Sequence, residues 1–396
     1  MSDRDHDKRR ATRAVRAGID DDAAHGAVTP PIVLSSTFTF EGYDRKRGYD
    51  YGRSGNPTRS QLADAIASLE GAAGGVVTAS GMGAITVVLT ALLGPGDRIV
   101  VPHDCYGGSW RLFNALGDKG AFVVDRVDLA DAAALAGAIA RQPAMVWIET
   151  PSNPLLRITD IAQVASAAKA AGAVVVADNT FLSPLLQRPL ELGCDIVVHS
   201  TTKYLNGHSD VIGGAVVARD AGTVETLGWW ANCLGLTGAP FDSWLTLRGL
   251  RTLPVRMRAH QDNAAAIADL LGRHPAVAAV HYPGLASHPG HALAAAQQDG
   301  FGAMLSFDLH GGEAAVKAAV EGLGLWTLAE SLGGVESLVA HPATMTHAAM
   351  SPEALALAGI GPGLLRLSVG IEQVDDLAAD LTAALDRALA ATRNPA

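Results

Sequence analysis

Two short apolar runs within AVVVADNTFLSPLLQRPLELGCDIVVHSTTK, residues 173–203, decide the fold class. The first run is AVVVAD (173–178), the second is CDIVVHS (194–200), and each ends in polar side chains. A strand that is apolar at nearly every position is buried on both faces, as in parallel sheets that helices cover on both sides. We therefore expect an α/β protein with a mostly parallel sheet.

The alternation of short apolar strands with Ala-rich helices continues on both sides of this stretch. Upstream strands are predicted at 75–79, 97–102 and 144–149, and helices over 60–69, after 81, from about 109 and over 160–171. A further strand, GGAVVARD (213–220), follows downstream. Repeated strand–helix–strand units predict a single sheet with helices on both faces.

The two ends of the chain differ from this central part. Residues 1–60 are rich in Pro, Gly and hydroxyl side chains and have no long period, which predicts an extended arm that contacts a neighbouring subunit. After residue 240 a long helix over 242–272, interrupted at Pro254, precedes strands at 303–309 and 364–370 and helices over 312–322 and 374–391. We expect an arm (1–60), a large domain (61–255) and a smaller C-terminal α/β domain (256–396).

The composition excludes several classes of protein. Of the 396 residues, 48% are hydrophobic and 18% are charged, so the chain can bury a large core and is not disordered in general. The 40 acidic and 30 basic residues give a formal net charge of −10, and the basic run is Lys8-Arg9-Arg10. This balance argues against binding to nucleic acids or to anionic membrane surfaces.

Cysteine usage and the hydropathy pattern indicate the compartment. The three cysteines, Cys105, Cys194 and Cys233, are widely spaced and form no CxxC, which predicts a reducing compartment and neither disulfides nor a metal site. The N-terminal residues lack the apolar segment of a signal peptide. The uncharged stretch 71–96 contains seven glycines, and its continuous apolar part is too short to span a membrane. We expect a soluble, cytoplasmic protein.

Three predicted strands end in polar residues, namely Glu149, Asp178 and His199. Ligands of open α/β sheets lie beyond the carboxyl ends of the strands, so these side chains should border one site. Lys203 follows the last of these strands directly, and it is one of only six lysines in a chain with 24 arginines. The other five lysines stand in polar or helical surroundings.

Lys203 and Asp178 together indicate a cofactor. A partly desolvated amine at a sheet edge loses its high pKa and becomes a usable nucleophile, although a lone lysine at this place is better explained as reaching into solvent. Asp178 could pair with a protonated ring nitrogen, although a lone Asp after a strand more often caps a turn or helix. Both residues at one edge meet the minimal requirement of pyridoxal phosphate chemistry.

A phosphate-binding turn is also predicted. Ser80-Gly81-Met82-Gly83 lies between a strand and a helix, where backbone N–H groups and a helix N-terminus can face an anion. The segment is not GxGxxG, because Thr86 occupies the last glycine position, so a dinucleotide site is poorly supported. Ser200 and Thr202 flank the lysine and add hydroxyl groups.

These residues stand in motifs that resemble the Cys/Met-metabolism pyridoxal-phosphate enzymes along nearly the whole chain. The matching segments are YGRSGNPT (51–58), SGMG (80–83), YGG (106–108), ETPSNP (149–154), DNTF (178–181), STTKYLNGHSD (200–210), LAESLGG (328–334), TMTH (344–347) and RLSVG (366–370). The resemblance implies the aspartate aminotransferase-like fold, which is fold type I of the PLP-dependent transferases. It also implies a homotetramer built from two active dimers.

The resemblance implies a role for each matching residue. Lys203 would carry pyridoxal 5′-phosphate as a Schiff base and then move protons, Asp178 would keep the ring nitrogen protonated, and Tyr106 would stack on the ring. The phosphate would be held by Gly81, Met82, Ser200 and Thr202 and by Tyr51 and Arg53 of the neighbouring subunit. Arg366 would bind the substrate α-carboxylate, with Asn153, Ser331, Glu330 and Arg111 as further substrate contacts.

Several segments indicate which reaction of the family to expect. Residues 102–113, 229–238 and 301–309 are most similar to the bacterial members that join an O-acylhomoserine to cysteine. The Trp229-Trp230 pair carries most of this similarity, and a packed aromatic pair in the core is the other interpretation. Glu330 favours γ- over β-chemistry. Synthases of this type can carry a second arginine directly after Arg53, whereas this chain has Ser54, as the lyases do. Arg111 therefore remains available for the distal carboxylate of the substrate.

The resemblance thus implies γ-replacement, in which O-succinyl-L-homoserine and L-cysteine give L-cystathionine and succinate for methionine biosynthesis. Cystathionine γ-lyase and O-acylhomoserine sulfhydrylase activities are the alternatives within the family. A nucleotide-dependent Rossmann enzyme is disfavoured by the missing GxGxxG. A binding protein without catalysis would have no use for Lys203, Asp178 and Arg366 together.

Overall fold

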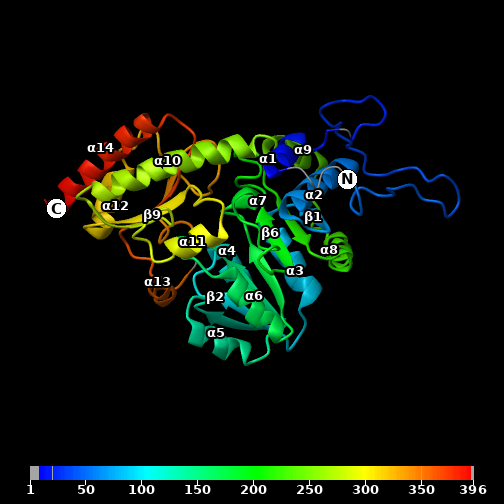
Figure 1. Cartoon of the computed structure of the whole chain (residues 1–396), viewed down its shortest axis with the longest axis horizontal. Helices are drawn as coiled ribbons and strands as arrows, with labels where there is room; N and C mark the ends of the chain where they lie inside the picture. The colour runs from blue at the N-terminus through cyan, green and yellow to red at the C-terminus, as the bar shows by residue number, and fades with distance from the viewer. Residues whose placement is uncertain (1–8, 20, 349, 394–396) are drawn as a thin grey trace.

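Residues 74–218 contribute a seven-stranded sheet with the order β1-β7-β6-β5-β4-β2-β3 (Figure 1). The computed structural model describes residues 9–19, 21–348 and 350–393. The strands are β1 (Gly74–Thr78), β2 (Arg98–Pro102), β3 (Val123–Val127), β4 (Met145–Glu149), β5 (Val174–Asp178), β6 (Ile196–Ser200) and β7 (Gly214–Ala218). All are parallel except β7, which is antiparallel to both β1 and β6.

Helices cover both faces of this sheet, as the apolar strands predicted. One face packs against α2 (Pro57–Glu70), α5 (Ala132–Ile139) and α6 (Ile161–Ala170), and the other against α3 (Gly81–Leu92), α4 (Gly107–Asp118) and α8 (Ala221–Leu234). Side chains alternate between the two cores along each strand, with Val197 in the first and Val198 in the second. The α/β class with a mostly parallel sheet is confirmed.

Two elements of this sheet were not predicted. Strand β3 lies at the edge beside β2, and in its sequence VVDRV the charged Asp125 and Arg126 interrupt the apolar run that marks a buried strand; only Val127 is buried. Helix α5 follows it and completes the connection to β4.

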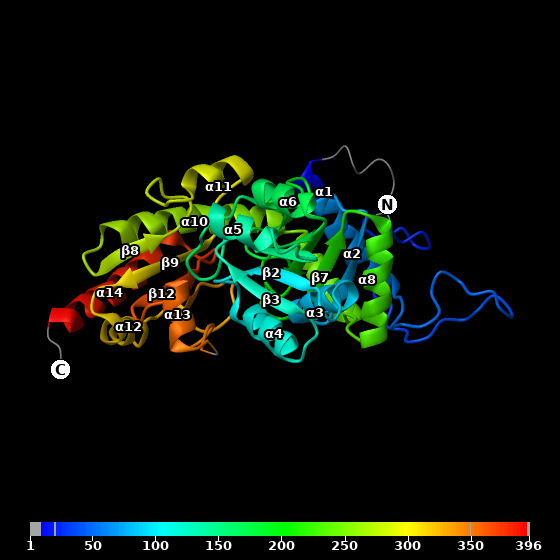
Figure 2. The same ribbon diagram turned by 90° about the horizontal axis from the view of Figure 1, so that it is seen from below.

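The C-terminal part forms a second sheet of five strands in the order β10-β11-β12-β9-β8. These strands are β8 (Val277–His281), β9 (Met304–Leu309), β10 (Thr327–Leu328), β11 (Leu338–Ala340) and β12 (Leu364–Ser368). Helices α11 (His291–Gln297), α12 (Gly312–Val320), α13 (Pro352–Ala358) and α14 (Val374–Arg393) accompany them. Figure 2 shows this sheet beside the first, with α12 and α14 lying at the outer end of the molecule.

The long helix expected over 242–272 is two helices, α9 (Pro240–Leu250) and α10 (Leu253–Arg273). Pro254 is in the first turn of α10, where its missing N–H leaves no intrahelical bond unmade. Residue 256, where the sequence predicted the start of a second domain, lies inside α10.

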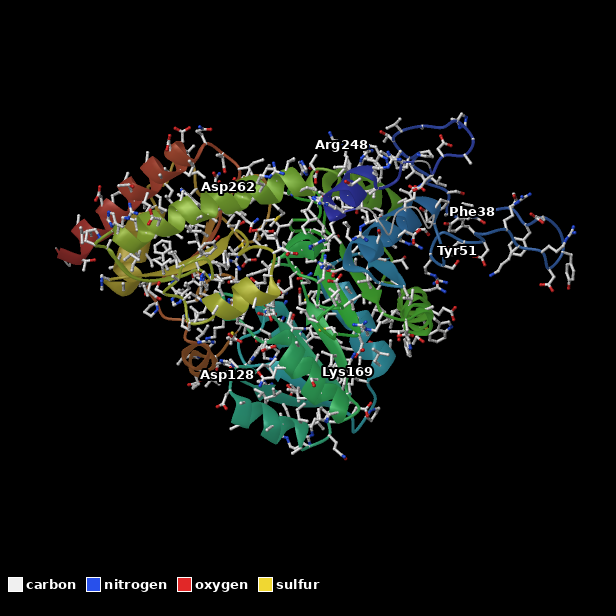
Figure 3. The ribbon with its side chains drawn as sticks, viewed as in Figure 1. Phe38, Tyr51, Asp128, Lys169, Arg248 and Asp262 are labelled. Atoms are coloured by element: carbon white, nitrogen blue, oxygen red, sulfur yellow. The ribbon has the colours of Figure 1, made fainter. Side chains whose placement is uncertain are left out.

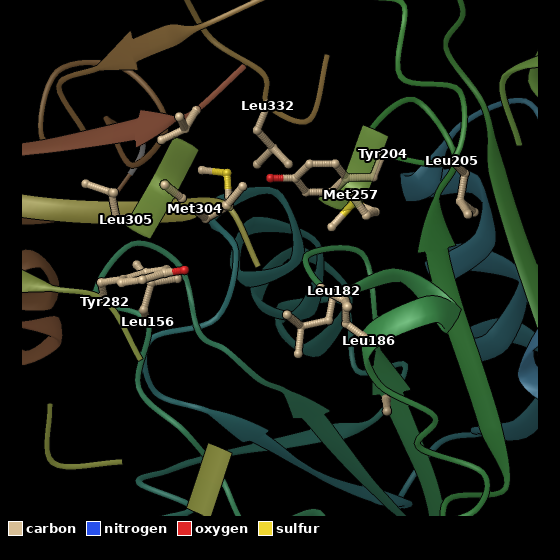
Figure 4. Close-up of a cluster of buried hydrophobic side chains, with 14 of the residues drawn as sticks. Leu156, Leu182, Leu186, Tyr204, Leu205, Met257, Tyr282, Met304, Leu305 and Leu332 are labelled. Carbon is tan, nitrogen blue, oxygen red and sulfur yellow. The ribbon is translucent and has the colours of Figure 1, made fainter. Parts of the chain in front are cut away.

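One hydrophobic cluster joins the two sheets (Figure 4). Leu182, Leu186 and Tyr204 come from the first sheet's connections, while Met257 and Met304 come from α10 and β9. The Tyr204 ring also packs edge-on against the His260 ring of α10 at 5.3 Å between centroids. The turn after β6 that carries Lys203 is therefore fixed by packing against the C-terminal part.

The N-terminal segment precedes both sheets. It begins with a short helix, α1 (Arg10–Arg16), whose Ala14 is fully buried. Residues 21–56 have no helix and only isolated bridges, such as Thr37 to Tyr51, and they extend away from the body of the molecule (Figures 1 and 2). Residues 1–8 of the predicted arm lie outside the described residues. Among the residues that are described, no helix combines the length and apolar character needed to cross a membrane.

Candidate active site

Two carboxylates stand side by side at the carboxyl ends of adjacent strands. Glu149 ends β4 and Asp178 ends β5, and the two residues are register partners. An Asp178 oxygen accepts the backbone N–H of Thr180 at 3.0 Å. Burial raises the pKa of Asp178, and burial together with the Asp178 charge raises the pKa of Glu149 well above its ordinary value.

Lys203 lies in the turn that follows β6, and its amine points to the C-terminal part of the chain. Its Nζ donates to the Ser331 hydroxyl at 2.7 Å. Burial, together with the nearby Arg366 charge, lowers the pKa of Lys203 to about 8, and Glu330 acts in the opposite direction. The amine is thus held in place and carries a smaller preference for the charged form than an exposed lysine.

Arg366 connects the residues around this amine. It lies on β12 and is 2% exposed, and its Nη2 donates to the Ser331 carbonyl at 3.0 Å while its Nη1 donates to Asn153 Oδ1 at 3.0 Å. Its Nε is buried and has no hydrogen-bond partner among the described residues. A buried guanidinium with an unpaired N–H is suited to an anionic ligand such as a carboxylate.

The start of α3 approaches the end of β6 closely. Ser80 caps this helix through its hydroxyl, which accepts the N–H of Gly83 at 3.0 Å. A Cβ on Gly81 would lie 2.8 Å from the Ser200 Cβ, so only glycine fits here. The first N–H groups of a helix have no intrahelical partner, and here they lie next to the Ser200 hydroxyl. Thr202 exchanges hydrogen bonds with the Gly213 backbone at 3.2 and 3.0 Å.

Tyr106 marks the open side of the site. It precedes α4, its side chain is 41% exposed, and its backbone N–H donates to Glu149 at 2.9 Å. A Cβ on Gly108 would meet both the Tyr106 ring and the Met82 sulfur, which shows that these two side chains lie together. Burial raises the pKa of Tyr106, and the charges that act on it include Arg111, Glu330, Arg366 and Glu149.

These residues fit pyridoxal phosphate. Asp178 forms no ion pair with a lysine or arginine among the described residues, so its carboxylate is available to a protonated ring nitrogen. The close approach of Gly81 to Ser200 forms a cradle of N–H and hydroxyl donors of the kind that binds a phosphate. Lys203 supplies an amine of lowered pKa.

Tyr51 and Arg53 are the predicted site residues that the chain does not bring to this cluster. Tyr51 is 51% exposed and lies on the extended N-terminal segment near Phe38 (Figure 3). The Arg53 guanidinium lies 5.7 Å from the centre of the Tyr51 ring. No hydrogen bond links either side chain to the other predicted site residues within the described part of the chain.

Some details differ from expectation. The expectation that His199 would border the site with Glu149 and Asp178 is wrong, because alternation along β6 turns His199 to the opposite core, where it contacts Glu70 at 2.7 Å. Thr180 was overlooked, although it bonds Asp178 and also accepts the Ser200 N–H at 2.9 Å. Its place two residues after Asp178, in DNTF, was the available signal.

The Trp229-Trp230 pair is not a core pair. The rings are edge-to-face at 5.1 Å on α8, and Trp229 is 61% exposed. Only Trp230 packs against the core under α3 and α8.

Comparisons with known proteins agree with this geometry. The model of the family described as "Cys/Met metabolism PLP-dependent enzyme" matches residues 11–386. Cystathionine gamma-synthase of Escherichia coli (strain K12) is 56% identical over 374 residues, 94% of this chain and 97% of that protein. Cystathionine beta-lyase of Lactococcus lactis subsp. cremoris (strain MG1363) is 46% identical over 376 residues, 95% of this chain and 98% of that protein.

A solved structure is still more similar. The cystathionine gamma synthase from Xanthomonas oryzae pv. oryzae, in complex with aminoacrylate and cysteine, is 67% identical, with a TM-score of 0.96. The match covers 97% of this chain and 99% of that one.

Proposed function

The chain belongs to the Cys/Met metabolism PLP-dependent enzymes, and from this membership we propose that it catalyses the cystathionine γ-synthase reaction. In this reaction the sulfur of L-cysteine replaces the γ-acyloxy group of an O-acylhomoserine. The proposed acyl substrate is O-succinyl-L-homoserine, so the products are L-cystathionine and succinate. The enzyme depends on pyridoxal phosphate and takes part in methionine biosynthesis.

One geometric observation supports this proposal. Ser331 joins Lys203 to Arg366: its hydroxyl accepts from the Lys203 amine, its carbonyl accepts from Arg366, and Arg366 also donates to Asn153. An anion that pairs with the Arg366 guanidinium therefore lies within reach of an amine that can move protons. An amino-acid substrate carries its α-carboxylate and its α-hydrogen on the same carbon, so a carboxylate bound by Arg366 brings that hydrogen toward the amine.

The cofactor supplies an electron-withdrawing ring that stabilises negative charge on the substrate carbons. Four groups of the chain would hold it. Lys203 would bind its aldehyde carbon, Asp178 would pair with the ring nitrogen, Tyr106 would contact the ring, and the α3 N-terminus with Ser200 would bind the phosphate. Thr202 is proposed as a further phosphate contact, although its hydroxyl is also engaged with Gly213.

Lys203 is the proposed acid and base. A pKa of about 8 leaves an appreciable fraction of the amine neutral near pH 7 to 8, so Nζ can accept a proton from the substrate α-carbon and later from the β-carbon. The Ser331 hydroxyl, 2.7 Å away, holds the amine in this position. The same nitrogen returns protons when the product forms.

Specificity is proposed to reside at the open side of the site. Glu330 and Arg111 are exposed there, and both act electrostatically on Tyr106. The Arg111 guanidinium can bind the distal carboxylate of a succinyl group, and Glu330 can bind the substrate amino group.

A dimer or tetramer is proposed because the site is incomplete within one chain. Tyr51 and Arg53 lie on the extended N-terminal segment, which exposes Leu34, Phe40 and Tyr43. Large apolar side chains on a projecting segment favour burial against a second chain. We propose that the segment before residue 61 completes the phosphate site of a neighbouring subunit, and that residues 61–255 and 256–396 form the large and small domains.

We also propose a cytoplasmic location, because the three cysteines are unpaired and two of them are buried.

The test is a product assay on the purified yellow holoenzyme. With O-succinyl-L-homoserine and L-cysteine we expect L-cystathionine and succinate, and without cysteine we expect 2-oxobutyrate and ammonia from the same substrate. A cystathionine-cleaving activity is the second candidate, because relatives at 46% identity are named cystathionine beta-lyase. An enzyme that consumes cystathionine and ignores the acylhomoserine would contradict the synthase proposal.

A further inference from the structure

Glu149 occupies a central place behind the site. Its side chain is 6% exposed at the end of β4, on the same face of the sheet as Asp178. Neither the proton transfers nor the substrate contacts described above use it. A carboxyl group buried this deeply needs a structural or chemical reason.

The contacts of Glu149 link two separate parts of the site. One oxygen accepts the backbone N–H of Tyr106 at 2.9 Å, and the backbone N–H of Asn153 lies close enough to the carboxyl group to lower its pKa. Tyr106 begins α4, whereas Asn153 lies in the loop after β4 and bonds Arg366. A single side chain thus ties the residue that covers the cofactor ring to the residue that orients the carboxylate-binding arginine.

The charges around Glu149 are almost all negative or neutral. Asp178 faces it from β5, and Asp104, Cys105 and Tyr106 face it from the segment after β2. Asp104 is itself paired with Arg157 at 2.9 Å, and no lysine or arginine of the described residues forms an ion pair with Glu149. Two adjacent buried carboxylates do not both ionise readily, and Asp178 is needed in its ionised form opposite a protonated ring nitrogen.

We propose that Glu149 is a positioning residue, which as a neutral carboxyl group holds the main chain at Tyr106 and Asn153. This inference rests on the proposed function. It implies that the length and the acceptor oxygen of Glu149 matter, whereas its negative charge does not. Glutamine keeps the length and the acceptor, and aspartate keeps the charge but is one methylene shorter.

The test compares E149Q and E149D as holoenzymes. For E149Q we expect kcat and KM within about threefold of wild type and an unchanged pH profile. For E149D we expect KM for the acylhomoserine and the dissociation constant of pyridoxal phosphate to rise about tenfold, because the Tyr106 and Asn153 amides lose their acceptor. Equilibrium dialysis measures cofactor binding independently of activity.

Asp380 provides the matched control. Its carboxylate also accepts backbone N–H groups, those of Gly324, Leu325 and Trp326, but at the far end of the C-terminal part. D380N should alter thermal stability only, with KM and cofactor binding unchanged.

Two results would overturn the inference. If E149D matches wild type in KM and in cofactor binding, Glu149 positions neither residue. If E149Q shifts the pH profile or loses more than about a hundredfold in kcat, the charge of Glu149 is used directly. If the wild-type holoenzyme forms no cystathionine, the proposed function is wrong. The role of Glu149 is then decided by the affinities of E149D and E149Q for pyridoxal phosphate. If E149D does not fold, E149A takes its place, with the same expected rise in KM and in the dissociation constant of pyridoxal phosphate.

Discussion

At the scale of single residues, Lys203 is distinguished from other described lysines by its surroundings. Its amine is bonded to Ser331, and its pKa is lowered to about 8, whereas Lys317 is exposed near Glu321. We expect K203A to lose at least about a hundredfold in kcat, because no other lysine of the described residues contacts the site residues. K317A is the control and should keep full activity. Circular dichroism of K203A should match wild type, and near-normal turnover by K203A would remove Lys203 from its proposed role.

His260 provides a prediction of pH dependence. Burial lowers the pKa of this α10 residue to about 4, and its Nδ1 bonds the Val369 carbonyl at 2.7 Å. The unfolded chain binds the proton below about pH 6.5, whereas the folded chain does not until about pH 4, so stability falls as the pH drops between these values. The loss from pH 7 to pH 5 should be about 2 kcal/mol.

Urea titrations at both pH values measure this contribution. H260Q should start from a lower stability at pH 7, and its stability should fall less on going to pH 5 than that of wild type. An equal fall in both proteins would show that His260 does not titrate between them. The buried His347 and the half-buried His288 also have pKa values lowered to about 4, and they should account for part of the remaining fall.

At the scale of elements, the start of α3 is sensitive to a single added methyl group. A Cβ on Gly81 would meet Ser200 at 2.8 Å, whereas Gly137, in α5, has open space around it. We expect G81A to weaken pyridoxal phosphate binding at least tenfold, because the helix must move away from β6. G137A should bind normally and be slightly more stable, by about 0.4–1 kcal/mol. Equal cofactor affinities in the two variants would show that the α3 terminus does not hold the phosphate.

The strands that are apolar at nearly every position could be predicted from the sequence alone. Strands such as β5 and β6 are buried on both faces, so their composition alone marks them, and the polar residue that ends β5 lies at the site. The edge strand β3 could not be recognised in this way, because it is partly exposed to solvent and contains Asp125 and Arg126. The antiparallel direction of β7 could not be predicted either, because an apolar sequence such as GAVVA is equally compatible with parallel and antiparallel pairing.

Side-chain direction limits what sequence predicts about the site. Lys203, Asp178 and Arg366 stand in long motifs, and their roles follow from resemblance. The motif does not say that His199 turns to the opposite core, because that depends on the phase of alternation along β6. Nor does it say that Glu149 bonds the main chain of Tyr106, a contact between residues 43 positions apart.

At the scale of the whole molecule, the proposed exchange of N-terminal segments between subunits can be tested with two impaired variants. R53A should lose about 10- to 100-fold in pyridoxal phosphate affinity, because a charge-assisted hydrogen bond is removed. K203A keeps an intact N-terminal segment but has no catalytic amine. A hybrid dimer of the two variants contains one complete site.

Refolding an equimolar mixture of R53A and K203A should therefore recover about a quarter of wild-type activity at limiting cofactor. Each variant refolded alone is the control, and gel filtration reports whether dimers form. If R53A keeps its cofactor as wild type does, or if the mixture recovers nothing beyond its parts, Arg53 does not act across subunits.

The antiparallel strand β7 has a consequence for synthesis of the chain on the ribosome. Strand β1 is the first strand to leave the exit tunnel, but its pairing partner is β7, and Gly74 is matched with Ala218. At ordinary translation rates β1 waits on the order of 10 s before that partner exists. During this time its Val76 and Val77 are shielded only by the nascent α2 and α3, so slow stretches of translation before residue 218 should increase the demand for chaperones.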